Sequence, residues 1–312
     1  METQSCIQQI KFNGFVNVGQ DVLTKEDVKE LSSRAKNIFN NLNPNHCDYL
    51  KAGAGAGGVR CIVEHDFKLA EIANKIVTHP EIKKTLEAIL GVDYKIWQIN
   101  FRRSLPGDQG LQLHQDGKGQ LNLCVLLDDN LNGDGATSFF SQTHLIRKRT
   151  KELKVELDPK LFKTVKFLIK PFSGHMGDLG IFLNRTWHGR FPNKTNIPHD
   201  ILMIGFFPAN TDYRLSEPYK IWSQEFLDSI KGSELFRLIN PNIGTQKISE
   251  DVYRVLSTNN SESFAFRIEN FKNEEHLKNN LKLRAGVAFL TNVMKAGRPF
   301  KRILRKIKGK MA

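Results

Sequence analysis

Two histidines and one aspartate in this sequence have the spacing of a metal site. His114 and Asp116 form a His-x-Asp pair, and His188 follows far downstream in the segment Thr186-Trp187-His188-Gly189. Two neutral imidazoles and one carboxylate are the ligands that hold non-haem Fe(II) on one face and leave the opposite face open. The sequence therefore predicts an iron site whose open positions could take oxygen and a co-substrate.

The residues around the first two ligands have the alternation of half-buried strands. Residues 95–103 alternate strictly between two kinds of side chain, and residues 120–127 form a second strand-like run that ends in turn residues. In an extended strand Gln112, His114 and Asp116 point to the same side. We therefore expect both ligands to come from one strand end, and the third ligand to come from a strand adjacent in space.

The order of the motifs resembles the phytanoyl-CoA dioxygenase family of iron(II)/2-oxoglutarate oxygenases over roughly residues 10–210. Besides the His-x-Asp pair and the distal His, the matching pieces are residues 13–18, Pro106-Gly107, Asn132-Gly133, Thr143-His144, Gly177-Asp178 and residues 192–195. This resemblance implies a mainly β fold with flanking helices, in which a double-stranded β-helix forms a cupin-like jelly-roll barrel. It also implies that His114, Asp116 and His188 bind Fe(II).

The resemblance further implies an Fe(II)/2-oxoglutarate-dependent dioxygenase that hydroxylates an aliphatic C–H bond while 2-oxoglutarate is decarboxylated. In such an enzyme the cofactors carry the oxidation and the protein positions the reactants. Two other functions fit the same residues. One is a non-catalytic or metal-only barrel that binds a polar ligand or acts as an adaptor, and the other is a cupin-like isomerase or epimerase with His114 as its base.

The sequence departs from the family where the far carboxylate of 2-oxoglutarate is usually bound. The family usually has an Arg about 11 residues after the distal His, because its planar fork pairs with a carboxylate. This chain has His199 at that position. The residues that could bind the co-substrate instead are His199, Arg102, Arg190, Asn122, Asn193 and Thr195.

A row of polar residues predicts one wall of the substrate pocket. Gln98, Asn100 and Arg102 share one face of the strand at 95–103, which is either the polar interior of a barrel or the solvent face of an edge strand. We expect the substrate pocket to be lined by Gln98, Asn100, Gln112 and Lys118.

Composition and length describe an ordinary soluble protein. The chain has 312 residues, of which 40% are hydrophobic and 25% charged, and it shows neither a secretory signal nor a membrane-spanning run. A cytoplasmic location is therefore expected. The four cysteines include no Cys-x-x-Cys, so we expect neither a disulfide framework nor a structural zinc site.

Three domains or segments are expected along the chain. Residues 1–240 would form the oxygenase domain with its N-terminal helices, residues 241–294 a C-terminal helical extension, and residues 295–312 a basic tail.

Helix signals occur at three places. Residues 24–42 predict a helix capped by Thr24, residues 66–90 predict two helices divided at His79-Pro80, and a further helix is expected within residues 224–239. The helices before residue 91 would pack outside the main sheet. The glycine-rich residues 51–60 lack the Gly-Lys-Ser/Thr of a phosphate loop and predict a mobile loop near the pocket mouth.

The C-terminal tail has a separate character. Eight of its residues are Lys or Arg and none is acidic, so the tail accounts for most of the formal net charge of +13. Apolar residues recur at helical spacing beside the cations Arg298, Lys301, Arg302, Arg305 and Lys306. This pattern is typical of a helix that lies on an anionic membrane surface, which favours an anionic substrate, lipid-linked or glycan, near the membrane. An acidic partner or plain solvation also fits, whereas no motif indicates nucleic acid.

Overall fold

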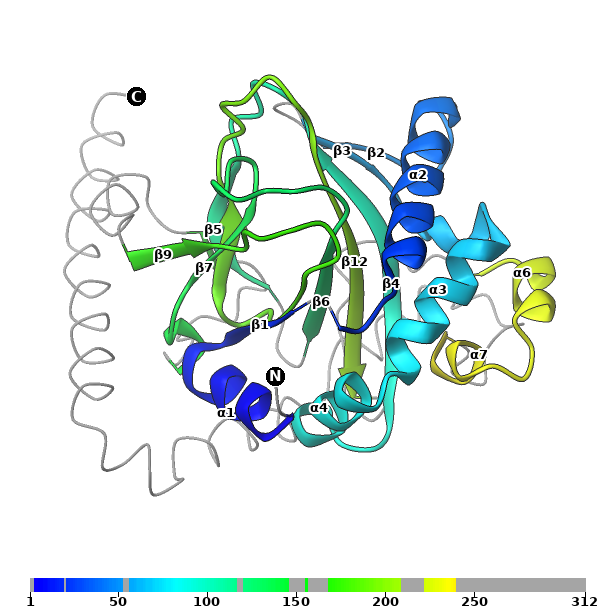
Figure 1. The fold of residues 1–312 in the computed structure, drawn as a ribbon, viewed down its shortest axis with the longest axis horizontal. Helices are drawn as coiled ribbons and strands as arrows, with labels where there is room; N and C mark the ends of the chain where they lie inside the picture. The colour runs from blue at the N-terminus through cyan, green and yellow to red at the C-terminus, as the bar shows by residue number, and fades with distance from the viewer. Residues whose placement is uncertain are drawn as a thin grey trace, which may run out of the picture.

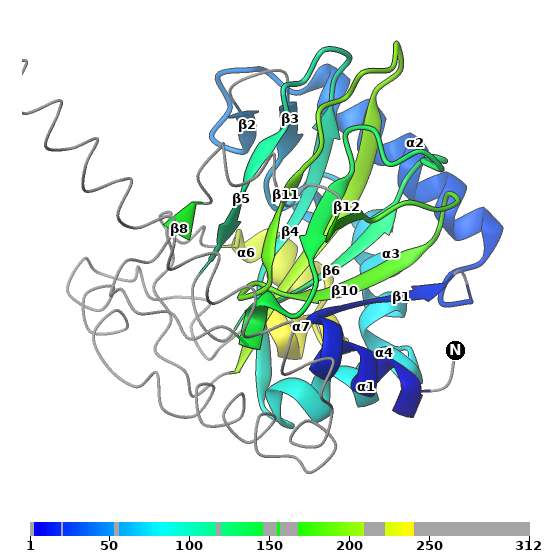
Figure 2. The same ribbon diagram turned by 90° about the vertical axis from the view of Figure 1, so that its left-hand side faces the viewer.

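The computed structural model describes residues 3–19, 21–52, 56–116, 120–145, 155–156, 168–208 and 222–239. Within these ranges the strands form two antiparallel sheets (Figures 1 and 2). The larger sheet has, from edge to edge, β1 (Phe15–Gly19), β10 (Leu179–Leu183), β6 (Leu121–Leu126), β12 (His199–Pro208), β4 (Tyr94–Ser104), β3 (Ala56–Val59) and β2 (Tyr49–Ala52). The smaller sheet has β8 (Val155–Glu156), β5 (Leu111–Gln115), β11 (Trp187–Arg190), β7 (Thr137–Phe140) and β9 (Ile169–Pro171).

The chain passes back and forth between the two sheets. It leaves β5 in the smaller sheet for β6 in the larger one, and it later runs from β10 to β11 and on to β12, changing sheet each time. Strands that alternate in this way and pair antiparallel build the double-stranded β-helix expected from the resemblance. The predicted fold is confirmed.

The two faces of the larger sheet differ in polarity. On β4, Ile99 and Phe101 are completely buried on the outer face, where they join the main hydrophobic core. The inner face of the same strand carries Asn100 and Arg102, which line a cavity between the sheets. β4 lies between β12 and β3, so it is not an edge strand. Its polar face lines the cavity inside the fold. The alternative of a solvent-facing edge strand is wrong.

The outer apolar face is covered by helices whose ends follow local signals. Thr24 caps α2 (Lys25–Asn41) by accepting the N–H of Asp27 at 3.1 Å, and Pro80 begins α4 (Pro80–Leu90) directly after α3 (Phe67–Thr78). Figure 1 shows α2 and α3 along the outer side of β4. The predicted helices at 24–42 and 66–90 are confirmed, including their position outside the sheet.

Other helices depart from expectation. The segment 224–239 forms two short helices, α6 (Gln224–Ser229) and α7 (Glu234–Ile239), because the chain turns at Gly232 with a φ of +86°. The helix α1 (Thr3–Asn13) was not predicted, since its buried side chains Cys6 and Ile10 are too few to form a clear stripe. Two 3-10 turns, η2 (Ile62–Glu64) and η3 (Thr143–Leu145), complete the described helices.

Outside residues 53–55, which the structure does not describe, the glycine-rich segment is mostly strand rather than loop, and Arg60 at its end lines the cavity. Its ends form β2 and β3, which pair with each other, and β3 also pairs with β4. Glycine is required at position 58, because a Cβ there would lie 2.3 Å from the carbonyl oxygen of Phe101. Three of the four residues of β3 are Ala or Gly, which are uncommon in strands, so the sequence pattern did not indicate this strand.

Parts of the sequence prediction fall outside the described ranges. These parts are Lys118, the C-terminal extension at 241–294 and the tail at 295–312 with its cations. In the part of the chain that the structure describes, no helix combines the length and the apolar character needed to cross a membrane.

Candidate metal centre and pocket

Neighbouring strands of the smaller sheet bring the three predicted ligands together. In the pairing of β5 with β11, His188 lies directly opposite His114, and Asp116 follows the end of β5. The Nε2 atom of His188 is 3.2 Å from Oδ2 of Asp116, and Nε2 of His114 is 3.6 Å from Oδ1. One ligand atom from each residue lies within 4.8 Å of the other two.

Backbone carbonyls fix which nitrogen each imidazole offers. Nδ1 of His114 lies 2.8 Å from the carbonyl oxygen of Gln112, and Nδ1 of His188 lies 2.8 Å from that of Thr186. Since a carbonyl only accepts hydrogen bonds, each Nδ1 carries the proton and donates. Both Nε2 lone pairs are thereby directed toward Asp116, as metal-binding imidazoles require.

The residues present fit a divalent metal. Ligand atoms about 2.1 Å from one metal and at right angles to each other lie about 3 Å apart, close to the two separations seen here. The side chains of His114 and His188 are only 7% and 8% exposed, whereas that of Asp116 is 36% exposed. Two buried imidazoles with one more open carboxylate leave one side of the centre accessible.

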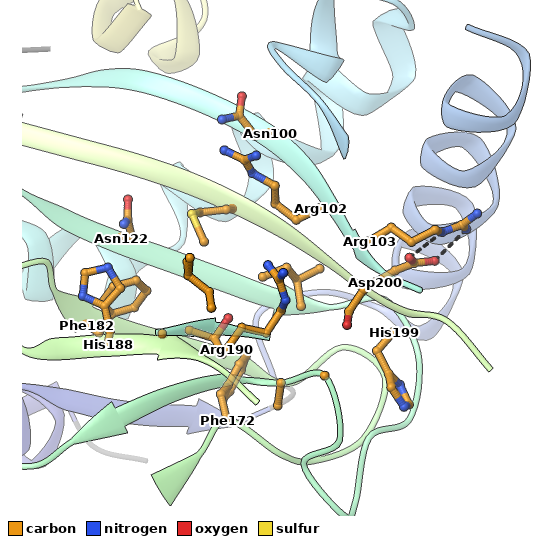
Figure 3. Close-up of a pocket in the computed structure, with 18 of the residues that line it drawn as sticks. Asn100, Arg102, Arg103, Asn122, Phe172, Phe182, His188, Arg190, His199 and Asp200 are labelled. Carbon is orange, nitrogen blue, oxygen red and sulfur yellow. Dashed lines mark hydrogen bonds and ion pairs between the residues drawn. The ribbon is translucent and has the colours of Figure 1, made fainter. Parts of the chain in front are cut away.

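A cavity of about 520 Å³ between the sheets adjoins this centre (Figure 3). All three ligands line it, and so do several residues that were predicted to bind substrate or co-substrate: Gln98, Asn100, Arg102, Asn122, Arg190 and His199. The aromatic rings of Phe172 and Phe182 add an apolar wall, and the Phe182 ring centre lies 5.0 Å from that of His188. The cavity is therefore continuous with the candidate metal centre.

A row of side-chain amides crosses the inner face of the larger sheet. Asn100 donates to Gln98 at 2.6 Å, and Gln98 donates to Asn122 at 3.3 Å. Asn122 then donates to Asn184 at 2.6 Å, and Asn184 donates to Gln120. Each amide from Asn100 to Asn184 thus donates to its neighbour in the row, and these bonds offset the cost of burying polar groups inside the fold.

Two members of this row were not predicted from the sequence as site residues. Asn184 lies one residue past β10, and Gln120 lies one residue before β6. The available signal was the alternation of β10, because Asn184 falls two positions after Phe182 and so faces the same cavity.

His199, at the position of the family's usual arginine, is held by a carboxylate. Its Nδ1 lies 3.2 Å from Oδ1 of Asp128, and its Nε2 lies 3.5 Å from the Thr195 hydroxyl. Burial raises the pKa of Asp128, although the N–H of Asp200 and the His199 ring favour the ionised carboxylate. Figure 3 shows the His199 ring directed away from Asn122 and His188.

Asn193 and Thr195 have structural contacts rather than a place on the cavity wall. The Asn193 amide donates to the carbonyl oxygens of Ser104 and Ile197, and its own oxygen accepts from the Thr195 hydroxyl at 2.7 Å. These bonds fix the loop that enters β12. The two residues predicted to contact the co-substrate thus brace the strand that carries His199.

The predicted pocket residue Gln112 is exposed, and it does not line the cavity. The pairing of β11 with β5 shifts between His188, opposite His114, and Arg190, opposite Leu111. This bulge interrupts the alternation of β5, so Leu111 lines the cavity in place of Gln112. The carbonyl of Gln112 still matters, because it orients His114.

Arg190 reaches the cavity from β11 while bound to a buried aspartate. Its Nε and Nη2 donate to Asp108 at 2.6 and 3.1 Å, and the hydroxyl of Ser104 donates to the same carboxylate at 2.7 Å. Burial alone would raise the pKa of Asp108, but the hydrogen bonds from Arg190, Ser104 and the Gly110 N–H outweigh it and hold the pKa below its ordinary value.

This pairing predicts a pH dependence of stability. Because the pKa of Asp108 is lower in the folded chain than its ordinary value of 3.8, its ionised form stabilises the fold above that value, and the stabilisation is lost as pH falls through the folded pKa. Urea unfolding at about pH 6 and about pH 3 should therefore show a smaller pH effect in Asp108→Asn than in the wild type. The exposed Asp21→Asn serves as the control, and an unchanged pH effect in Asp108→Asn would contradict the assignment.

Comparisons with known proteins agree with this geometry. The family model described as phytanoyl-CoA dioxygenase (PhyH) matches residues 10–199. No curated protein sequence matches the chain.

Solved structures share the fold at low sequence identity. The epimerase SnoN, in complex with Fe3+, alpha ketoglutarate and nogalamycin RO, has a TM-score of 0.54 and 17% identity, covering 66% of this chain and 84% of that chain. The carbocyclase SnoK has a TM-score of 0.53 and 14% identity, with coverages of 66% and 84%. HygX from Streptomyces hygroscopicus, with nickel, 2-oxoglutarate and hygromycin B bound, has a TM-score of 0.52 and 12% identity, with coverages of 69% and 93%.

Proposed function

Because the chain belongs to the phytanoyl-CoA dioxygenase family, we propose that it is an Fe(II)/2-oxoglutarate-dependent oxygenase that hydroxylates an aliphatic C–H bond. The observation that carries the proposal is the meeting of two imidazole Nε2 atoms with the Asp116 carboxylate at one side of a polar cavity. The ligand set of two His and one Asp is the one used by non-haem iron oxygenases. The iron and 2-oxoglutarate predicted from the sequence match the cofactors named for SnoN.

When bound, iron and 2-oxoglutarate supply the oxidation, in which dioxygen is consumed and the 2-oxo acid is decarboxylated to succinate. The chain's own residues position the reactants. The carbonyls of Gln112 and Thr186 hold the two imidazoles in the tautomer that binds metal. Phe182 packs beside His188 and limits the access of water to that side of the centre.

The cavity wall supports a polar and anionic substrate. The amide row offers both donors and acceptors, so hydroxyl groups such as those of a glycan would find partners there. Arg60 and Arg102 also line the cavity and would attract a negative charge. We extend the proposal to an anionic substrate, lipid-linked or glycan, whose polar part enters between the sheets.

Turnover without added substrate tests the proposed reaction class. With Fe(II), 2-oxoglutarate and air, the purified protein is expected to form succinate slowly, and a chelator should stop this until Fe(II) is added back. Succinate is measured by mass spectrometry. Iron binding without any succinate would contradict the oxygenase. In a separate assay, conversion of an added substrate without oxygen would instead favour an isomerase with His114 as base.

We further propose that the protein is cytoplasmic and that its basic tail binds an anionic membrane surface. Removing residues 295–312, which lie outside the described ranges, is expected to abolish co-sedimentation with vesicles containing phosphatidylserine. Vesicles of phosphatidylcholine alone are the control and should leave both forms in solution. Equal pelleting of the full chain and the truncated chain with anionic vesicles would show that the tail is not needed for membrane binding.

A further inference from the structure

We propose that the turn between α2 and β2 holds a second metal site, which binds Zn²⁺ through His46, Cys47 and Asp48. None of these three residues lines the cavity beside the candidate iron centre. The inference goes beyond the proposed function, because it concerns other residues and needs neither iron nor 2-oxoglutarate.

The turn brings an imidazole, a thiol and a carboxylate together. One ligand atom from each residue lies within 4.8 Å of the other two. Nδ1 of His46 is 3.7 Å from Oδ2 of Asp48 and 3.9 Å from Sγ of Cys47. Ligand atoms in a tetrahedron around one zinc, at about 2.0–2.3 Å from it, lie about 3.3–3.8 Å apart. The observed separations are close to these values, so small side-chain movements would complete the site.

The hydrogen bonds of the turn prepare the His46 imidazole for a metal. Its Nδ1 accepts the backbone N–H of Asp48 at 3.1 Å, so this nitrogen carries a lone pair rather than a proton. A metal would take this lone pair in exchange for one hydrogen bond. The backbone is fixed separately, because the His46 N–H donates to the Asn43 carbonyl at 2.8 Å and the Tyr49 N–H donates to the His46 carbonyl at 3.0 Å. The turn therefore presents its ligands without refolding.

A fourth residue, His65, holds the carboxylate from the segment between η2 and α3. Its Nε2 lies 3.0 Å from Oδ2 of Asp48, and its ring meets the His46 ring edge-on with centres 5.5 Å apart. Since a carboxylate only accepts hydrogen bonds, Nε2 carries the proton and donates. Loss of a residue that orients a metal ligand in this way costs about 10- to 100-fold in metal affinity. His65 is therefore a positioning residue of the proposed site.

The donor set favours zinc over iron. A thiolate is a soft ligand that suits Zn²⁺, whereas the centre in the cavity offers nitrogen and oxygen alone. The sequence has no Cys-x-x-Cys, and this site needs none, because a single thiolate is joined by an imidazole and a carboxylate. Cys47 is exposed, so the metal can reach the turn from solvent, and the thiol proton is released when it binds.

The site is connected to the cavity wall by one hydrogen bond. The carbonyl of Asp48 accepts the N–H of Arg60 at 2.8 Å, and Arg60 lines the cavity. A metal that binds the folded turn stabilises the fold by mass action. Zn²⁺ is therefore expected to raise the melting temperature of His114→Ala, in which the other metal centre is broken, and to leave that of the double variant His114→Ala with Cys47→Ser unchanged.

Co²⁺ is the probe that separates the two metal centres, because a thiolate bound to cobalt gives a charge-transfer band in the near ultraviolet. The full chain, kept reduced and free of oxygen, is titrated with Co²⁺, and the band gives the Kd. Zn²⁺ should displace the cobalt and remove the band. Cys47→Ser is expected to lose the band, whereas His114→Ala should keep it, since the centre in the cavity has no thiolate.

Substitutions at position 65 test the positioning role. His65→Ala should weaken Co²⁺ binding about 10- to 100-fold. His65→Gln keeps an N–H donor for the Asp48 carboxylate and should recover part of the loss. His175→Ala removes an exposed histidine from another turn and should leave the Kd unchanged.

Three outcomes would overturn the assignment. A wild-type protein without the thiolate band does not bind metal at this turn. A band that persists in Cys47→Ser comes from another cysteine. An unchanged Kd in both His46→Ala and Asp48→Asn would mean that the thiol binds cobalt without the other two ligands. Circular dichroism of each variant confirms that the fold is retained, and Cys47→Ser changes only an exposed side chain.

Discussion

Replacing His114 with Ala is expected to abolish iron-dependent turnover and to weaken Fe(II) binding by more than about 100-fold. Loss of a residue that only orients a metal ligand costs about 10- to 100-fold, and His114 is itself a ligand in this account. The remaining pair, Asp116 and His188, would offer two donors in place of three. Asp116→Ala should have the same effect, because it removes the carboxylate that both imidazoles face.

Equilibrium dialysis with Fe(II) and the succinate assay measure the two effects separately. His175→Ala is the control, since this histidine is exposed on a turn between β9 and β10 and lies outside the cavity lining. It should bind iron and turn over as the wild type does. Activity that survives in His114→Ala would show that the site assignment is wrong.

Replacing Arg103 with Met is expected to lower the free energy of unfolding by about 3–5 kcal/mol. Asp200 is completely buried, and Arg103 satisfies both of its oxygens. The arginine also lies over the rings of Phe39 and Phe101, at 4.9 and 5.5 Å from their centres. Without Arg103, the cation that the described residues still offer this buried carboxylate is Lys36, whose Nζ is 3.8 Å away.

Urea unfolding of single and double variants tests this effect. The double variant Arg103→Met with Asp200→Leu should recover most of the stability, because replacing both members of a buried pair by apolar residues is often neutral. Lys29→Gln, at an exposed position of α2, should change stability by less than about 0.5 kcal/mol. A single variant as stable as the wild type would mean that the pair contributes little to the fold.

Local sequence signals predicted much of this fold for a physical reason. Alternation identified β4 because one of its faces packs in the core and the other lines the cavity. The cap at Thr24 and the break at Pro80 are governed by neighbouring backbone groups, so they are readable without tertiary structure. His114 and Asp116 share a strand end, and their spacing alone placed them near one point.

Other features depend on how distant strands come into register, and the sequence pattern did not reveal them. The bulge that turns Gln112 out of the cavity arises from the pairing of β5 with β11. Arg190 binds Asp108 and His199 lies beside Asp128 because their strands meet in space, not along the chain. The strand β3 consists mostly of Ala and Gly, which are uncommon in strands.

An anaerobic titration with Fe(II) followed by 2-oxoglutarate tests whether His114, Asp116 and His188 form the iron site. If these three residues hold an iron that 2-oxoglutarate chelates, a weak visible charge-transfer band appears in the wild-type protein and is lost in His188→Ala. Iron binding without a band, or a band that persists in His188→Ala, would contradict the account.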